Sequence, residues 1–240
     1  MARRVLLTGG AGFIGSHVCD ELLAHGYEVR ALDALDAQVH GDERPHYLDP
    51  QVELIVEDVR NAEAVERALH GVDAVIHLAA AVGVGQSMYD IAGYTSANDL
   101  GAAVVAGAVA RRPVERLVVA SSMSVYGEGL ARREDGSTVA PEPRPLSQLR
   151  QGRWDVVDEM GAALAPRPTP ESKPPYLTSI YALNKYAQER IFLITGEAYR
   201  IPTVALRFFN VYGPRQALSN PYTGVLAIFA ARLLNGRPPL

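Results

Sequence analysis

RVLLTGGAGFIG, Arg4 to Gly15, is the stretch that decides the fold of this chain. An apolar run leads through a glycine turn into an amphipathic segment, and the turn fits two spacings: GxxGxxG (Gly9, Gly12, Gly15) and GxGxxG (Gly10, Gly12, Gly15). Glycine permits positive φ, lets backbone N–H groups approach a pyrophosphate at the helix N-terminus, and allows close helix–strand packing. A glycine triplet alone also suits a plain tight turn, but a strand before it and a helix after it favour a dinucleotide-binding βαβ unit.

Outward from this turn, short apolar runs alternate with segments of helical periodicity. We expect strands at Val5–Thr8, Val29–Leu32, Val52–Val56, Ala74–Leu78, Leu117–Ala120 and Thr203–Phe208. We expect helices at Gly12–His25, Ala62–Leu69, Thr95–Arg111, Tyr181–Tyr199 and Gly224–Asn235. Strands alternating with helices imply a parallel sheet covered on both faces. The sequence therefore predicts an α/β fold with a doubly wound parallel sheet of the Rossmann type.

The composition limits the kind of partner. The chain has 240 residues, a formal net charge of -4 and no long basic run, so it shows no footprint for nucleic acid or an anionic membrane. The single cysteine, Cys19, excludes an internal disulfide framework and is expected in the core, which fits a reducing cytoplasm. We find neither a leader segment nor an apolar run of about 18 residues, so we expect a cytoplasmic protein with a small-molecule partner.

Proline interrupts the alternation between Glu128 and Pro175, where eight of the sixteen prolines fall. Proline removes backbone donors and disfavours both helix and ladder, so we expect an irregular surface excursion there, with a short helix around Trp154–Leu164. No strand of the central sheet is expected in this segment.

Asp33 ends the second expected strand, where a carboxylate can accept both hydroxyls of a ribose and would repel a 2'-phosphate. We therefore expect NAD rather than NADP. Arg30 is the nearby cation that could weaken this preference, but its place in the strand alternation suggests a solvated side chain. Asp58 follows the third strand and either meets the adenine or caps the next helix; both interpretations remain open.

Tyr181 and Lys185, in YALNK, are four residues apart and therefore project together from a helix. The lysine ammonium can lower the pKa of the tyrosine from its ordinary value and can hold a nicotinamide ribose. A surface Tyr/Lys pair has the same spacing. The fifth strand adds a third element, because VVASSMSVYG (Val118–Gly127) places serine hydroxyls at the carboxyl edge of the sheet, where ligands bind.

Together these motifs resemble the extended short-chain dehydrogenase/reductase family, in its NAD-dependent nucleotide-sugar epimerase/dehydratase branch. TGGAGFIG, Asp33, HLAA (His77–Ala80), SSMSVYG, YALNK and RFFNVYGPRQ (Arg207–Gln216) occur in family order along nearly the whole chain. GVGQS (Gly83–Ser87), the segment SNPYTGVLAIFAARLLNGRPP (Ser219–Pro239) and the long insertion after VYGEG are most similar to enzymes of the dTDP-rhamnose 4-epimerase type.

The resemblance implies roles for individual residues. Tyr181 corresponds to the catalytic base, Lys185 to its partner and Ser122 to the hydroxyl that bonds the sugar oxygen. The implied cofactor contacts are Gly9, Gly12, Phe13, Ile14, Gly15, Asp33, Asp58, Val59, Leu78, Ala79, Ala80, Asn98, Tyr181 and Lys185. The implied substrate contacts are Gln86, Ser87, Ser122, Ser124, Asn210 and Arg215. Asn98 has a second interpretation as a polar bond inside its helix. His77 is expected to pack near the cofactor, and no metal site is expected.

Two positions bear on the reaction. Dehydratases of this branch carry an Asp-Glu pair directly after the catalytic Ser/Thr, for acid and base work, whereas this chain has Met123 and Ser124. We therefore expect a 4-epimerase that inverts carbon 4 of a nucleotide-activated sugar through a transient 4-keto intermediate. A nucleotide-sugar 4,6-dehydratase or a dehydrogenase is the alternative enzyme.

The organisation of the chain leaves a further alternative. The domain expectation is an NAD-binding domain over residues 1–240, with the insertion at 128–175 and the beginning of a substrate-binding region at 210–240. Relatives continue beyond this point, so a truncated NAD-binding protein without turnover is the alternative of a different class. The resemblance also implies a homodimer through the helices Thr95–Arg111 and Tyr181–Tyr199, with Ile191, Ile194 and Ala198 in an apolar stripe; burial of that stripe in the core is the competing interpretation.

Overall fold

The computed structural model describes residues 3–40, 43–217 and 224–238. The chain divides into two units, one from residues 1–122 and 179–240, which we call the main unit, and one from residues 123–178, which we call the insertion unit. Each unit is described by itself.

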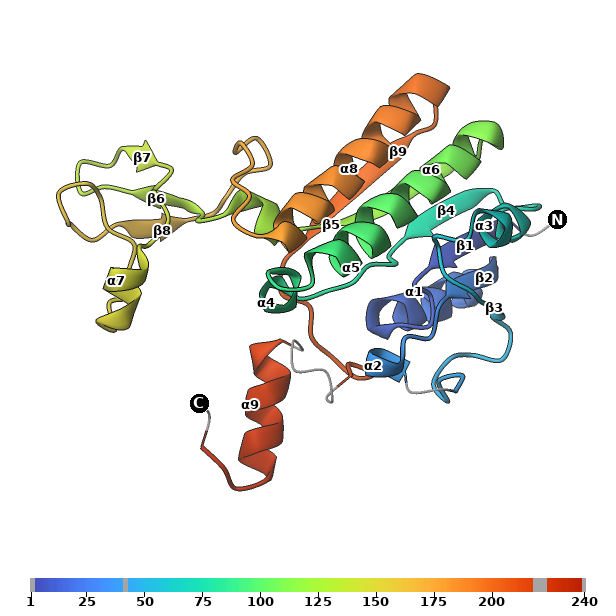
Figure 1. Cartoon of the computed structure of the whole chain (residues 1–240), viewed down its shortest axis with the longest axis horizontal. Helices are drawn as coiled ribbons and strands as arrows, with labels where there is room; N and C mark the ends of the chain where they lie inside the picture. The colour runs from blue at the N-terminus through green and yellow to red at the C-terminus, as the bar shows by residue number, and fades with distance from the viewer. Residues whose placement is uncertain (1–2, 41–42, 218–223, 239–240) are drawn as a thin grey trace. The chain divides into compact units, whose positions relative to one another are not determined.

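Six parallel strands form the sheet of the main unit, in the order β3-β2-β1-β4-β5-β9 (Figure 1). Their bounds are β1 Arg4–Thr8, β2 Glu28–Asp33, β3 Glu53–Val56, β4 Ala74–His77, β5 Arg116–Ser122 and β9 Thr203–Phe208. This order, with β1 central, is that of a doubly wound dinucleotide-binding sheet. The register pairs Thr8 with both Leu32 and His77, so the carboxyl ends of β1, β2 and β4 meet at one edge.

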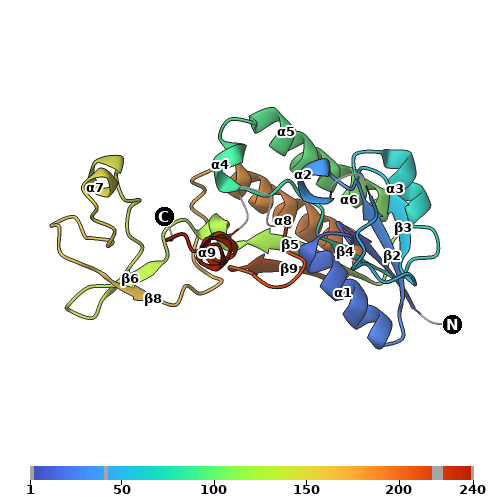
Figure 2. The same ribbon diagram turned by 90° about the horizontal axis from the view of Figure 1, so that it is seen from below.

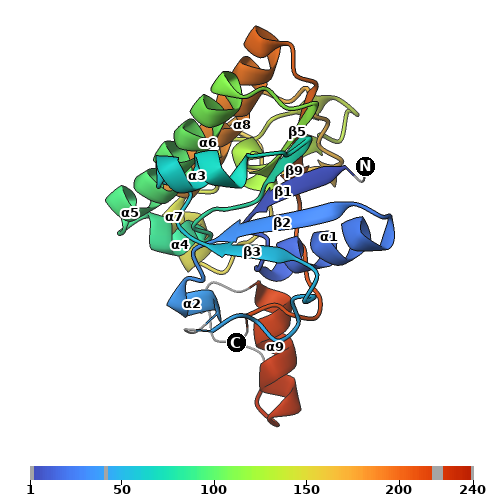
Figure 3. The same ribbon diagram turned by 90° about the vertical axis from the view of Figure 1, so that its right-hand side faces the viewer.

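The helices cover two faces of this sheet because neighbouring strand residues point to opposite sides. On one face, Leu6 joins a buried cluster with side chains of α3 (Ala62–Ala68), α6 (Gly101–Arg111) and α8 (Ile180–Tyr199). On the other, Val5 and Leu7 join a second cluster with Cys19 of α1 (Phe13–Ala24) (Figure 3). The expected burial of Cys19 is confirmed, since it is 0% exposed.

The helix expected at Thr95–Arg111 begins earlier and is not uniform. It runs as α5 (Ile91–Thr95), a π-helical turn η1 (Ser96–Leu100) and α6, with α8 beside it (Figure 2). The shorter or peripheral elements of the main unit are α2 Ala37–His40, α4 Val84–Ser87 and α9 Val225–Leu234. Among the described residues, no helix has the length and apolar character needed to cross a membrane.

The insertion unit has a small sheet of its own, in the order β7-β6-β8. Its elements are η2 Met123–Tyr126, β6 Leu130–Arg132, β7 Thr138–Val139, α7 Leu146–Arg150 and β8 Ala165–Arg167. The two ends of the unit are tied together, because Tyr176 N donates to Val125 O at 2.8 Å and Lys173 Nζ donates to Tyr126 O at 2.6 Å. Its strands pair with one another and add nothing to the six-stranded sheet.

The helix expected around Trp154–Leu164 is absent, and that prediction was wrong. Asp158 Oδ1 accepts from the backbone N–H groups of Met160 and Ala162 at 2.9 Å, and Gly161 has a φ of 82°. An aspartate that bonds the backbone two residues on, followed by a glycine with positive φ, favours a tight turn over a helix. The bridge between Val157 and Ala163 closes this turn as a small hairpin.

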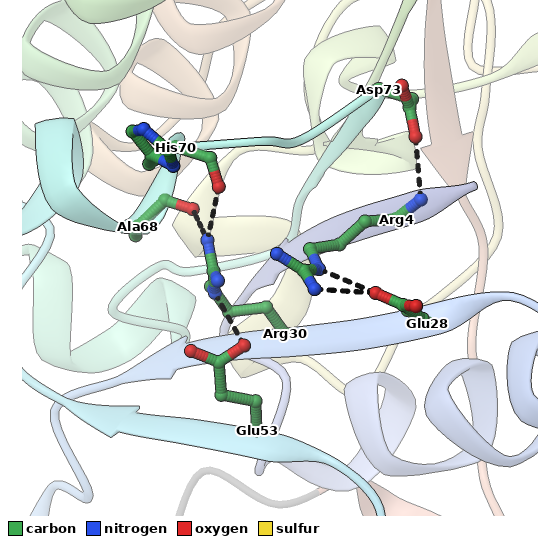
Figure 4. A network of polar contacts seen from close by, with 7 residues as sticks. All are labelled: Arg4, Glu28, Arg30, Glu53, Ala68, His70 and Asp73. Carbon is green, nitrogen blue, oxygen red and sulfur yellow. Dashed lines mark hydrogen bonds and ion pairs between the residues drawn. The ribbon is translucent and has the colours of Figure 1, made fainter. Parts of the chain in front are cut away.

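The expectation that Arg30 is solvated was also wrong (Figure 4). Arg30 is 8% exposed, and its Nη1 donates to the carbonyl oxygens of Ala68 and His70 at 2.7 and 2.8 Å. Its Nε lies 2.9 Å from Glu53 Oε2 as an ion pair. A cation at the C-terminal end of α3 is favoured by the helix dipole, so Arg30 joins α3 to the sheet.

Phe192 of α8 is the largest fully buried side chain in the described part of the chain, and it contacts the His77 ring at a centroid distance of 4.8 Å. Phe192→Ala leaves a cavity in the first core cluster, so we expect the free energy of unfolding to fall by about 3–5 kcal/mol. Urea unfolding followed by circular dichroism measures this. Phe209→Ala, at a side chain that is 61% exposed, is the matched control and should change stability by about 0.5 kcal/mol or less.

Candidate functional site

The glycine turn after β1 is shaped by close backbone approach. Gly9 has a φ of 71° and its N–H donates to Leu32 O at 2.8 Å. A Cβ on Gly9 would lie 2.8 Å from Ala79 N, and a Cβ on Gly15 would lie 2.1 Å from Gly9 O. Gly12, at the N-cap of α1, has no side chain with which to cover the first-turn amides. The turn therefore presents the backbone that a pyrophosphate group requires.

Asp33 is buried beside this turn. Its Oδ2 accepts from Ala11 N at 2.9 Å, and its Oδ1 accepts from Leu35 N at 3.0 Å. His40 Nε2 lies 3.7 Å from Oδ1, and no sequence motif predicted this neighbour. The carboxylate of Asp33 thus stabilises the glycine turn through its bond with Ala11. It lies at the end of β2, where a ribose would lie in a sheet of this topology.

The other residues expected near the nucleotide fall into two groups. Leu78 and Ala79, followed by Ala80, begin the segment after β4, where Leu78 N donates to Thr8 O at 3.0 Å and Ala79 N to Thr8 Oγ1 at 3.3 Å. Phe13 and Ile14, on the first turn of α1, line an apolar hollow that also includes Val211.

Asp58 does not cap the following helix. The N-cap of α3 is Asn61, whose side chain accepts from Ala64 N at 3.2 Å. Asp58 Oδ1 instead accepts from Arg60 N at 2.8 Å, and hydrogen bonds from Arg60 hold the pKa of this carboxyl below its usual range. Its neighbour Val59 belongs to the first core cluster. The capping interpretation of Asp58 is therefore wrong, and the contact with adenine stays a proposal.

Tyr181 lies at the start of α8, next to the end of β5. The helix begins with Ser179 as N-cap, which accepts from Ala182 N at 3.1 Å, and Tyr181 N donates to Ser87 Oγ at 3.1 Å. Burial raises the pKa of the Tyr181 phenol, and a side-chain hydrogen bond with Ser122 opposes this. The structure therefore brings Tyr181 and Ser122 together at the carboxyl edge of the sheet.

Lys185 is 3% exposed, and burial lowers the pKa of its ammonium to about 7. Its Nζ donates to Gln188 Oε1 at 2.7 Å. Lys185 was expected to lower the pKa of Tyr181, but burial dominates and raises this pKa, and the ammonium of Lys185 donates to Gln188. Gln188 was missed, although its position three residues after Lys185 places it on the same helix face.

Asn98 lies in the π-helical turn and is fully buried. Its Oδ1 accepts from Ala81 N at 2.8 Å and its Nδ2 donates to Ala81 O at 3.1 Å. Its own carbonyl accepts from Gln188 Nε2 at 3.2 Å. Asn98 thus bonds the segment after β4 and not a group of its own helix, so the interpretation as a polar bond inside the helix is wrong, and a role beside the cofactor stays a proposal.

A second buried polar cluster stands behind Ser122 and was not expected from the sequence. Glu189 of α8 accepts from Ser121 Oγ at 2.7 Å and from Arg207 Nε at 2.9 Å. The ion pair with Arg207 lowers the pKa of the Glu189 carboxyl, against the effect of burial. A carboxylate paired in this way anchors the end of β5 to α8 and β9.

The residues expected to contact substrate are less closely grouped. Gln86 Oε1 accepts from the Tyr94 hydroxyl at 3.2 Å, and Ser87 Oγ donates to Val84 O at 2.7 Å. Asn210 is exposed after β9. Arg215 Nη1 lies 2.7 Å from Asp20 Oδ2, with its guanidinium over the Tyr47 ring. Ser124 belongs to the insertion unit.

Comparison with known proteins identifies the class. Residues 5–148 and 158–240 match the NAD dependent epimerase/dehydratase family, and the chain belongs to this family. NAD, expected from Asp33 and the glycine turn, is the cofactor of the family.

Particular relatives agree with the sequence-based resemblance. The chain is 36% identical over 233 residues to dTDP-L-rhamnose 4-epimerase of Burkholderia thailandensis, covering 95% of this chain and 63% of the relative. A Thermus thermophilus UDP-glucose 4-epimerase structure in complex with NAD is 35% identical, with a TM-score of 0.74, covering 98% of this chain and 64% of the other. A Thermotoga maritima UDP-glucose 4-epimerase structure with UDP-glucose is 28% identical, with a TM-score of 0.76 and the same two coverages. The chain thus spans less than two thirds of the length of these relatives.

We expect NAD to bind more tightly than NADP, because Asp33 offers its carboxylate to ribose hydroxyls and repels a 2'-phosphate. Asp33→Asn removes the charge, so the ratio of the dissociation constants for NADP and NAD should fall by about tenfold, the scale of one charge-assisted hydrogen bond. Calorimetric titration with both cofactors measures it. Asp36→Asn is the control, at a nearby aspartate whose Oδ1 accepts from Gln38 N at 2.8 Å. Tighter binding of NADP by the unmodified protein would contradict the assignment.

Proposed function

We propose that the complete protein is an NAD-dependent epimerase that inverts carbon 4 of a nucleotide-activated sugar through a 4-keto intermediate. The observation that carries this proposal is the meeting of Tyr181 and Ser122 at the carboxyl edge of the sheet, one helical turn from the buried Lys185. Relatives named as nucleotide-sugar 4-epimerases, of which 36% identity over 233 residues is one instance, support the reaction class.

NAD, when bound, would supply the hydride acceptor and donor for carbon 4. In this proposal Tyr181 Oη takes the proton of the carbon-4 hydroxyl while the hydride leaves, and gives it back in the reverse step. Ser122 holds the same sugar oxygen. Burial raises the pKa of Tyr181, so the neutral phenol dominates in the free protein. Lys185 and the positive nicotinamide would together favour the phenolate when the cofactor is bound.

The chain's own residues fit a nucleotide at the glycine turn. A Cβ at Gly9 or Gly15 would collide with backbone, so both positions favour a residue without a side chain. We propose that this turn holds the pyrophosphate, Asp33 the adenosine ribose and Lys185 the nicotinamide ribose, with Asp58 near the adenine. The remaining proposed contacts are Phe13, Ile14, Val59, Leu78, Ala79, Ala80 and Asn98.

The sugar side of the proposal concerns Gln86, Ser87, Ser124, Asn210 and Arg215. The Ser87 hydroxyl is fully buried and already bonded to Tyr181 N and Val84 O, so its proposed role is to position Tyr181. Met123 and Ser124 lack the acid and base that water elimination requires, which favours epimerisation over 4,6-dehydration.

Tyr181→Phe keeps the ring and deletes the oxygen that would carry the proton. We expect turnover to fall about 100-fold or more, the usual scale for a lost general base, while folding and NAD affinity change little. The measurement is carbon-4 stereochemistry by NMR, with a panel of nucleotide sugars. The turnover of Ser122→Ala should fall less than that of Tyr181→Phe, because this substitution removes only a hydrogen bond that positions the sugar oxygen.

Tyr186→Phe, at a half-buried tyrosine of the same helix, is the matched control and should keep full turnover. Equal turnover of Tyr181→Phe and the unmodified protein would end the proposed mechanism. A 4-keto-6-deoxy product would move the assignment to a dehydratase.

We also propose a homodimer through α6 and α8. Ile194 is 55% exposed on α8 and Leu183 is 47% exposed on the same helix, whereas Ile191 packs against the core. Exposed apolar side chains along one helix favour contact with a second copy. Light scattering at micromolar concentration should give twice the chain mass for the unmodified protein and the mass of one chain for Ile194→Glu. A monomeric mass for the unmodified protein would contradict this proposal.

A further inference from the structure

Gln188 is a fully buried polar side chain at the centre of the main unit. It follows Lys185 by three residues on α8, and its Oε1 accepts from Lys185 Nζ at 2.7 Å. Its Nε2 donates to the carbonyl of Asn98 at 3.2 Å and lies 3.4 Å from His77 Nε2. His77 Nδ1 is in turn 2.8 Å from Thr8 Oγ1, next to the glycine turn. One glutamine therefore joins the lysine to the π-helical turn and to β4.

The orientation of this amide is fixed by its partners. A carbonyl can only accept, so Gln188 must point its NH₂ group at Asn98 O and its oxygen at Lys185. The opposite orientation would set two donors against the ammonium and leave two buried acceptors facing each other, which is costly in a dry interior. The Lys185 ammonium has three donors, and Gln188 takes one.

The charged and titratable groups of the elements packed around this point are otherwise engaged. Burial holds the pKa of His77 at about 3, so its ring is neutral. Asp99 accepts from Asn184 Nδ2 at 2.9 Å, and Glu189 is bonded to Arg207 and Ser121. Tyr181 is bonded to Ser122. The acceptor that the structure records for the Lys185 ammonium is thus a neutral amide.

We propose that Gln188 is a positioning residue for Lys185: its amide oxygen anchors one ammonium donor, favours the charged form of the side chain, and leaves two donors for Tyr181 and a nucleotide ribose. The role in turnover rests on the proposed function. The anchoring itself does not, since it concerns the protein without ligand. A carboxylate at position 188 would form a tight ion pair, and an aliphatic side chain would leave the buried ammonium without this acceptor.

The chain contains two lysines, Lys173 and Lys185, which allows a direct measurement on the full 240-residue protein. We would label the lysine ε-carbons with ¹³C and follow both signals by NMR against pH, assigning them with Lys173→Arg. The Lys185 signal should titrate near 7, because burial lowers its pKa to about that value. Lys173, whose Nζ donates to Tyr126 O in the insertion unit, is the internal control.

Two substitutions should move the Lys185 midpoint in opposite directions. Gln188→Leu removes the acceptor that favours the charged form, so the midpoint should fall by about one pH unit or more. Gln188→Glu places a carboxylate there, so the midpoint should rise by a similar amount. The Lys173 signal should not respond to either change. Gln148→Leu, at a buried glutamine whose Nε2 donates to backbone carbonyls of the insertion unit, should leave the Lys185 midpoint unchanged.

A purely structural role for Gln188 would lower stability in both variants without opposite shifts. Unchanged Lys185 midpoints in folded variants overturn the proposal, and if Gln188→Leu does not fold, Gln188→Glu decides alone. Because the titration needs neither cofactor nor substrate, its outcome is separate from the turnover of Tyr181→Phe. If the Lys185 midpoint shifts in opposite directions in the two Gln188 variants while Tyr181→Phe keeps full turnover, the anchoring is upheld and the proposed function is refuted.

Discussion

The approach of α1 to the end of β1 is the constraint on which the rest of the site depends. Gly15 sits where any Cβ would come within 2.1 Å of Gly9 O, and Gly9 adopts a positive φ against the segment after β4. This contact sets where the helix starts, and with it the direction of its first-turn amides. It also brings Ala11 to Asp33, so the carboxylate at the end of β2 is held by the same turn. Three neighbouring strand ends are thereby fixed by one backbone geometry.

The second half of the site follows from burial on α8. A helix that covers a parallel sheet would ordinarily present apolar side chains, yet α8 buries Lys185, Gln188 and Glu189. A buried polar side chain must be hydrogen-bonded to be tolerated in the interior. Lys185 bonds the amide oxygen of Gln188, Gln188 bonds a main-chain carbonyl, and Glu189 bonds an arginine. These bonds join α8 to β5, β9 and the π-helical turn. The stability of the fold and the placement of Tyr181 therefore rest on the same side chains.

Much of the fold was predictable because strand and helix periodicities are local properties of the sequence. The six strands and the long helices were placed to within a few residues, and the strand order matches that expected for a doubly wound sheet. The errors came from side chains that act over a distance. The alternation of inward and outward side chains along the strand predicted a solvated Arg30, whereas its guanidinium donates to carbonyls at the end of α3. At Asp158 the side chain accepts a hydrogen bond from a backbone amide and so competes with helix formation. The prolines around this segment made that turn difficult to recognise in the sequence.

The grouping of Tyr181, Ser122 and Lys185 was also predictable, from spacing on a helix and from the shared edge of parallel strands. Gln188 was not predicted, although it shares a helix face with Lys185, because its other partner is a carbonyl of η1 that is 90 residues away in the sequence. The Glu189–Arg207 pair was missed for a second reason: polar residues with helical spacing are ordinarily assigned to solvent.

The π-helical turn Ser96–Leu100 makes the arrangement of its neighbours depend on helix length. A π turn holds one residue more than an α turn. Removing that residue would rotate Ile91–Thr95 by about 100° relative to Gly101–Arg111, the angular step of one helical residue. Asn98 would then lose Ala81 and the carbonyl offered to Gln188 in a single event. The contacts of Asn98 therefore depend on the number of residues in this helix, and not only on which side chains it carries.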